Sequence, residues 1–305
     1  MVEESNIPVE QLTDHEVWRR ALSRGEIHHG AAQAIGRHIA GAVFDTSVFG
    51  MERDAFVEEV LRSANPERRR EIEIEVFTEP IDGPDRHSWL ESNLHDVLEM
   101  RADRSFTSAV SDAKYMFMTQ AEAFLHGDLD TGTILVRKPD GSQDADSVVV
   151  VDSLSPLYGP GAFDLGTVWA GYVIAAARGY AFREDERARW CLSLVVDTWD
   201  AFEWAFRERW PERRETRLWD DYFLERLLHR WRNEAWLYSS PRLARHAMDA
   251  AKTKDTESLP LELREGAVRG ALRIARSVSS ERWVDSAPEH YRQLSEWLLV
   301  EARTA

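Results

Sequence analysis

The sequence contains a single cysteine, few lysines and no long apolar run. Cys191 alone excludes a disulfide framework and any zinc site built from cysteines. No window approaches the ~18 uncharged apolar residues of a membrane-spanning helix. The first residues, Met1-Val2-Glu3-Glu4-Ser5, are acidic, whereas a signal peptide starts with basic residues and continues with an apolar run. We therefore expect a cytoplasmic protein with no membrane partner.

Positive charge is also scarce. The 305 residues include 38 Lys and Arg against 54 Asp and Glu, which gives a formal net charge of −16. Such a surface repels phosphate backbones, so we do not expect a nucleic-acid partner. Only four of the basic residues are lysines, and the first of them is Lys114.

Apolar periodicity indicates an α+β fold that is mostly α. Two short β-runs, 134–136 and 148–151, flank the turn signal Pro139-Asp140-Gly141 and predict a hairpin in the middle of the chain. Asp14 is a candidate helix cap, and Glu71–Val76 alternates acidic and β-branched residues as a strand would. Helices are expected from Asp14 through Leu22 and over 30–44, 52–63, 91–101, 105–123, 218–237, 240–252, 261–279 and 285–302, with everything after Phe163 helical.

The chemistry is concentrated in the segment 124–136. An apolar approach ends in His126-Gly127-Asp128, a short loop follows, and Thr133 precedes a strand. This order is typical of a kinase catalytic loop, in which an Asp accepts the proton of the substrate hydroxyl and a polar residue five positions later contacts metal. The alternative interpretation is a tight turn in which Asp128 only caps backbone.

The second β-run supports the kinase interpretation. Val148–Val151 leads directly into Asp152, where kinases place a magnesium-binding Asp after a hydrophobic strand. The two strands and the Asp at this distance together favour the kinase loop over the simple turn.

The chain resembles the methylthioribose kinase family, which belongs to the aminoglycoside phosphotransferase-like kinases with a protein-kinase-like fold. The most specific match is Tyr158-Gly-Pro-Gly-Ala-Phe-Asp164-Leu-Gly166, a segment that general aminoglycoside kinases lack. Further similar segments are Phe77–Pro80, Asp85–Ser88, Lys114–Met118, Arg242–His246 and Asp255–Ser258. The resemblance covers about residues 12 to 280 and implies a C-terminal kinase lobe with a small β-hairpin carrying the catalytic loop.

The resemblance also implies roles for individual residues. Its implied activity is transfer of the γ-phosphate of ATP to a small sugar in methionine salvage, with Mg²⁺ and ATP as cofactors and a homodimer by analogy. Asp128 would be the catalytic base, Asp152 and Thr133 would bind the metal, Arg245, His246 and Asp130 would contact the sugar, and His126, Gly127 and Asp164 would support the loop.

The chain departs from the family pattern on the nucleotide side. No glycine-rich loop precedes His126, no lysine precedes Lys114, and Leu154 stands where the family has a second carboxylate. The sequence thus predicts residues 1–305 to be a C-terminal lobe, with 1–13 as a hinge remnant, 124–166 as the catalytic and metal loops and 167–305 as a helical substrate-side subdomain.

Three interpretations follow from these departures. Another polypeptide could supply the nucleotide lobe to an active kinase, the chain could be an inactive pseudokinase that acts as a binding or regulatory module, or the sequence could be a gene fragment with a mis-called start. A separate alternative for the substrate is an aminoglycoside, because an acidic surface suits a polycation. The Tyr158–Gly166 segment argues against an aminoglycoside.

Other features favour structural interpretations. His28-His29 with Glu26 is expected to be a surface group and not a metal site, and Glu67–Arg70 a solvated helix end and not an anion site. The tryptophans Trp190, Trp199, Trp204 and Trp210 are expected to pack between helices.

Overall fold

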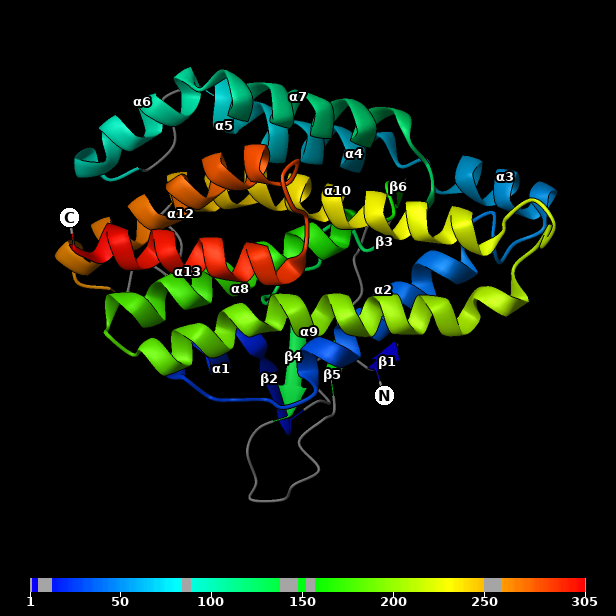
Figure 1. The fold of residues 1–305 in the computed structure, drawn as a ribbon, viewed down its shortest axis with the longest axis horizontal. Helices are drawn as coiled ribbons and strands as arrows, with labels where there is room; N and C mark the ends of the chain where they lie inside the picture. Colours follow the sequence, from blue (N-terminus) through cyan, green and yellow to red (C-terminus); the bar gives the residue numbers. More distant parts are fainter. Residues whose placement is uncertain are drawn as a thin grey trace.

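Long helices account for most of the chain in the computed structural model, which describes residues 2–4, 13–83, 89–137, 148–151, 157–249 and 259–304 (Figure 1). The longest helices run roughly along the long axis of the molecule, and α6 and α7 form one edge of it. The helices are α1 Trp18–Arg24, α2 Ala31–Asp45, α3 Arg53–Arg62, α4 Pro66–Ile72, the π-helical η2 Glu73–Thr78, α5 Glu79–Asp82, the 3-10 turn η3 Glu91–Asn93, α6 Leu94–Ala102, α7 Arg104–Thr119, α8 Phe163–Ala181, α9 Asp185–Arg209, the 3-10 turn η4 Trp210–Glu212, α10 Asp221–Met248, α12 Leu261–Glu281 and α13 Pro288–Thr304.

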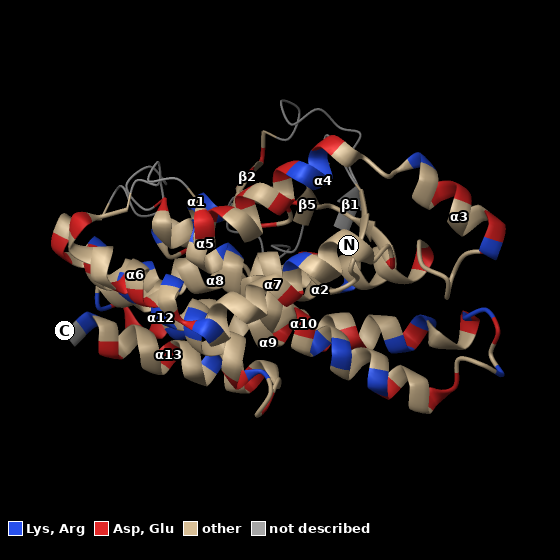
Figure 2. Cartoon of the chain, turned by 90° about the horizontal axis from the view of Figure 1, so that it is seen from above, with Lys and Arg blue, Asp and Glu red and all other residues tan. Residues whose placement is uncertain are grey.

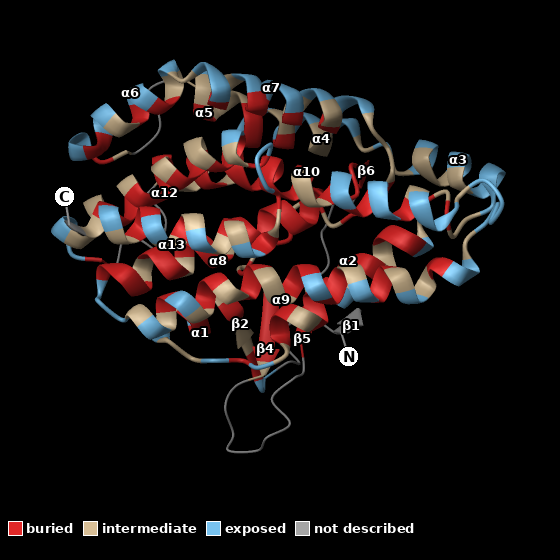
Figure 3. Cartoon of the chain, viewed as in Figure 1, coloured by how far each residue is buried: buried red, intermediate tan, exposed pale blue. Residues whose placement is uncertain are grey.

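Helix α8 lies at the centre of the core. All but three of its residues are buried, as its apolar character on every side predicts (Figure 3). It packs against α9, α10 and α12. Gly166 permits the closest approach, because a Cβ there would lie 2.6 Å from the carbonyl oxygen of Ala235 in α10. In contrast, α3 has no buried residue.

Two small sheets flank the segment 126–133. The first has the strand order β1-β5-β4-β2, in which β1 (Val2–Glu4) runs parallel to β5 and the other neighbours are antiparallel. Its remaining strands are β2 His15–Val17, β4 Ile134–Arg137 and β5 Val148–Val150. The second sheet pairs β3 (Ala123–Leu125) with β6 (Leu157–Gly159). The loop therefore starts at the end of one strand pair and ends at the start of another.

The structure confirms the fold class and several elements. The chain is α+β and mostly α, and the predicted hairpin exists, with Leu135 opposite Val149. The expected turn Pro139-Asp140-Gly141 lies outside the described residues. The helices expected over 30–44, 52–63, 261–279 and 285–302 correspond to α2, α3, α12 and α13.

The predicted strand Glu71–Val76 is wrong. The segment is helical, in the end of α4 and in η2, and it buries Ile72, Val76 and Phe77 on one side. The same pattern places Ile72 and Val76 four residues apart, which also fits one face of a helix. Packing of these side chains against the core therefore favours the helix over the strand.

Three boundaries also differ from the prediction. Asp14 does not cap α1: it contacts the ring of His15 at 2.8 Å, and Val17 occupies the cap position. Helix α7 ends at Thr119, so 123–125 is free to form β3. The helices expected over 218–237 and 240–252 are one continuous helix, α10, with Pro241 buried inside it.

The structural expectations for the other features differ in their outcome. The expected surface position is wrong for His28, which is buried with its Nε2 3.2 Å from the Arg137 carbonyl. Trp199 and Trp210 are core residues, as predicted, whereas Trp204 is 57% exposed. Within the described segments, no helix is both long and apolar enough to cross a membrane. Charges of both signs are interspersed over the helices (Figure 2).

Candidate active site

The first turns of α8 hold the backbone of the loop. The buried carboxylate of Asp164 accepts hydrogen bonds from the backbone N–H groups of His126 (2.8 Å) and Gly127 (3.1 Å). Thr167, one turn later, donates its hydroxyl to the carbonyl of Leu129 at 2.8 Å. Burial raises the pKa of Asp164, while the neighbouring His126 and the two N–H donors oppose that rise. Asp164 thus supports the loop, in the position the sequence predicts for it.

Gly127 and His126 give the loop its bend. Gly127 has φ +78°, a left-handed conformation that a side chain would strain. The Nδ1 atom of His126 accepts from the backbone N–H of Asp128 (3.2 Å), and its Nε2 lies 2.8 Å from the carbonyl oxygen of Val151. An N–H only donates and a carbonyl only accepts, so these contacts place a donor against Nδ1 and an acceptor against Nε2. His126 therefore ties the loop to the residue before position 152.

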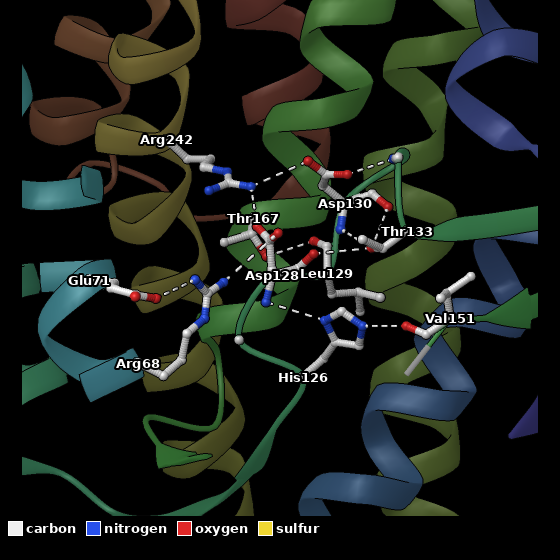
Figure 4. A network of polar contacts seen from close by, with 12 residues as sticks. Arg68, Glu71, His126, Asp128, Leu129, Asp130, Thr133, Val151, Thr167 and Arg242 are labelled. Carbon is white, nitrogen blue, oxygen red and sulfur yellow. Dashed lines mark hydrogen bonds and ion pairs between the residues drawn. The ribbon is translucent and has the colours of Figure 1, made fainter. Parts of the chain in front are cut away.

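Asp128 points outward from this bend, and its side chain is 40% exposed (Figure 4). Its Oδ1 accepts a hydrogen bond from Arg242 of α10 at 2.5 Å. Its Oδ2 lies 3.9 Å from the guanidinium of Arg68 in α4. Oδ2 is thus the atom of this carboxylate that remains accessible to another hydrogen-bond donor.

Asp130 forms the second acidic group of the site. It contacts Arg19 of α1 at 2.7 Å and Arg242 at 3.3 Å, and its Oδ1 accepts from the Gly132 N–H at 2.6 Å. Burial alone would raise the pKa of this carboxyl, but the guanidinium groups of Arg242 and Arg19 hold it below its ordinary value. Asp130, whose side chain is 14% exposed, is therefore the ionised partner of two arginines.

A narrow pocket of about 30 Å³ opens beside Asp130 between α1, α8 and α10. Its charged and polar lining includes Arg19, Asp130, Arg242 and His246. Three guanidinium groups, those of Arg19, Arg68 and Arg242, lie around Asp128 and Asp130. Arg68 is also paired with Glu71 at 3.2 Å, so three carboxylates balance the three guanidinium groups.

The structure brings together only some of the expected sugar contacts. His246 and Asp130 line the same pocket, whereas Arg245 does not. Arg245 forms ion pairs with Glu79 (3.3 Å) and with Asp249. Residues 242 and 246 are four apart and so share a face of α10, while 245 lies on the neighbouring one.

Three arginines of the site were not singled out from the sequence. The helical spacing of Arg242 to His246 could have identified Arg242. The sequence predicts Arg68 to lie in a solvated helix end. Because a strand is predicted at 71–76, the continuing helix that turns Arg68 toward Asp128 is not expected. The adjacent Arg69 also contradicts that assignment, because it is partly buried and donates to the carbonyls of Phe117 and Tyr158. No sequence signal placed Arg19 beside residue 130.

Of the two metal-binding residues predicted from the sequence, only Thr133 lies among the described residues. The Thr133 hydroxyl lies 3.0 Å from the carbonyl of Asp128 and 3.1 Å from both the carbonyl and the N–H of Asp130. Its oxygen is therefore engaged with the loop backbone. Asp152 lies outside the described residues. Thr133 by itself does not form a magnesium site, and we derive no step through a metal.

Comparisons with known proteins identify methylthioribose kinases as relatives. Methylthioribose kinase of Yersinia pestis (strain Pestoides F) is 30% identical over 280 residues, which cover 88% of this chain and 66% of that protein. Methylthioribose kinase of Escherichia coli O45:K1 is 31% identical over 294 residues, covering 88% of this chain and 67% of that protein. The chain thus spans about two thirds of the length of these curated relatives. No family model matches it.

Proposed function

Because the chain belongs to the methylthioribose kinase family, we propose that it is a phosphotransferase that moves the γ-phosphate of ATP to a hydroxyl of a small sugar of the methylthioribose type. The observation that carries this proposal is the presentation of Asp128. A loop held by Asp164 and His126 presents this carboxylate, half-exposed, next to a pocket lined by charged groups.

In this reaction the Oδ2 atom of Asp128 accepts the proton of the sugar hydroxyl. The sugar oxygen forms a bond to the γ-phosphorus, the bond from that phosphorus to the bridging oxygen breaks, and ADP leaves. Arg242 fixes Oδ1 at 2.5 Å, which leaves Oδ2 to face the hydroxyl. Positioning and charge neutralisation supply most of the catalysis in phosphoryl transfer, and Arg68 and Arg242 are the described cations closest to Asp128.

Sugar contacts are proposed for the pocket beside Asp130. A carboxylate, an imidazole and a guanidinium, from Asp130, His246 and Arg242, offer acceptors and donors to sugar hydroxyls. Arg245 could contact the sugar only if its ion pairs with Glu79 and Asp249 were broken. ATP and Mg²⁺ belong to the proposal through the family, with Asp152 and Thr133 as the predicted metal-binding residues. The homodimer, a second chain carrying the nucleotide lobe, and the cytoplasmic location stay predictions.

The test is release of ADP from ATP and Mg²⁺ in the presence of methylthioribose. Asp128→Asn keeps the shape of the side chain and removes the base, so turnover is expected to fall by 10² or more, a typical contribution of general base catalysis. Asp54→Asn, on the exposed α3, is the matched control and should leave turnover unchanged. Equal turnover by the Asp128→Asn variant and the unmodified protein would contradict the proposed base.

A pseudokinase is the second candidate, and two observations favour it. Asp128 is already ion-paired with Arg242, and the hydroxyl of Thr133 is engaged with the loop backbone. Calorimetry separates the two functions. A pseudokinase binds methylthioribose without releasing ADP under any condition, whereas a kinase that needs a second chain gains turnover when that chain is added. Tight magnesium-dependent ATP binding by this chain alone argues against the pseudokinase.

A further inference from the structure

A second pocket of about 500 Å³ lies between α7, α10 and the α12–α13 connection. Its volume falls in the range of small-molecule sites, roughly 300–1,000 Å³. It shares no lining residue with the pocket beside Asp130. The α12–α13 connection is the orange-to-red loop beside α10 in Figure 1, and the indole N–H of Trp236 donates to the Ser286 carbonyl there at 2.9 Å.

Glu234 is the feature that marks this pocket as a binding site. It lines the pocket, its side chain is only 6% exposed, and its Oε2 is buried without a hydrogen-bond partner. Its Oε1 lies 3.7 Å from the guanidinium of Arg230, which is beyond hydrogen-bond distance. A buried carboxylate oxygen that accepts no hydrogen bond is costly, and a donor from a ligand would remove that cost.

The three arginines that line the pocket donate to other groups, and Arg232 donates to the Ser286 hydroxyl at 3.4 Å. Arg230 donates to Glu122 at 2.6 Å. Arg282, which is only 4% exposed, donates to the Ser279 carbonyl (3.0 Å) and to Asn233 (2.9 Å). These guanidinium groups therefore do not satisfy Glu234, and the accepting oxygen stays available.

Aromatic and apolar surface surrounds this polar group. Trp283 and Tyr115 line the pocket and are 72% and 69% exposed, and Met116 and Leu237 contribute to the lining. The guanidinium of Arg282 covers one face of the Trp283 ring at 4.3 Å. Such large exposed rings around a cavity are suited to stacking against a flat ligand.

We propose that this pocket binds a small aromatic molecule that carries an amidine or amine group, with the cationic N–H donors on Glu234 and the ring between Tyr115 and Trp283. The site would be separate from the proposed reaction and independent of it.

The test uses three probes of nearly one shape: benzamidine, which is cationic, benzamide, which is neutral, and benzoate, which is anionic. Calorimetry and the indole N–H resonance of Trp283 report binding. We expect benzamidine to bind, benzamide to bind more weakly and benzoate not to bind. Equal binding of benzamidine and benzoate, or no benzamidine binding at millimolar concentration, would overturn the proposal.

Variants locate the site. Glu234→Gln should weaken benzamidine at least tenfold at pH 8, whereas Glu58→Gln, exposed on α3, should not. Trp283→Ala should also weaken benzamidine binding. Trp297→Ala is the control, because Trp297 is also exposed (56%) and lies outside the pocket. If the Glu234→Gln variant does not fold, the comparison of benzamidine binding by these two tryptophan variants tests the proposal. Displacement of benzamidine by methylthioribose would also contradict a separate site.

The pH dependence gives a further readout. Burial raises the pKa of Glu234 to about 7, with Glu122 raising it further and Arg230 and Arg282 opposing. Tyr238 is the other titratable group facing it. Because the ionised carboxylate binds the cation, benzamidine affinity should increase about tenfold from pH 6 to pH 8. A flat profile in the unmodified protein would refute the role of Glu234.

Discussion

The buried carboxylate of Glu234 should make the stability of this protein depend on pH. Its pKa is raised from 4.5 to about 7, chiefly by burial. Between these values the folded protein holds a proton that the unfolded chain releases, so the free energy of unfolding falls as pH rises from about 4.5 to 7 and then levels off. The side chain is only 6% exposed, so solvent screening does not reduce the effect greatly.

The magnitude follows from the shift. A change from 4.5 to about 7 corresponds to about 3 kcal/mol, of which about 2 to 3 kcal/mol falls between pH 5 and pH 8. The glutamine of Glu234→Gln resembles the protonated carboxyl. Between pH 5 and pH 8 the free energy of unfolding of this variant should therefore fall by about 2 to 3 kcal/mol less than that of the unmodified protein. Urea unfolding at pH 5, 6, 7 and 8 measures the difference, with Glu58→Gln as the exposed control. Parallel curves for the unmodified protein and the Glu234→Gln variant would refute the reasoning.

Other variants test the loop and its support. Gly166→Ala should cost about 1–3 kcal/mol in thermal unfolding, because its Cβ would meet the Ala235 carbonyl at 2.6 Å; an unchanged Tm would show that α10 moves freely. Asp164→Ala leaves two buried N–H donors unpaired and should cost about 2–4 kcal/mol, with lost protection of the His126 amide in hydrogen exchange. Asp130→Asn should be less stable at pH 7. Because the pKa of Asp130 is lowered, its contribution exists above about pH 4 and disappears on acidification, so acid titrations of this variant should be shallower; an equally steep titration would contradict the ion pairs.

The sequence predicted the parts of the site that depend on local chemistry. The order of His126, Gly127 and Asp128 and the hairpin after them follow from residue types at fixed distances along the chain, whereas the support from Asp164 was implied by the family resemblance. The hairpin and the loop support are observed directly, since Asp164 accepts from the loop N–H groups. The assignment of Asp128 as a base stays a prediction.

The parts that sequence could not predict depend on contacts between distant segments. The side chain that meets Asp128 comes from Arg242, 114 residues later, and the one that meets Asp130 comes from Arg19, 111 residues earlier. Local periodicity does not encode such pairs. The mistaken strand at 71–76 has the same origin, because burial of Ile72 and Val76 against the core decides the conformation of a segment with two compatible periods.

The central helix α8 has a geometric consequence for the site. Its first turns hold the loop that carries Asp128 through Asp164 and Thr167, and its Gly166 sets how near α10, with Arg242, can come. The positions of the Asp128 carboxylate and the Arg242 guanidinium therefore both depend on α8. Their 2.5 Å separation responds to the distance between two helices and not to loop motion alone. An increase in the distance between α10 and α8 would therefore separate Arg242 from the Asp128 carboxylate without a rearrangement of the loop.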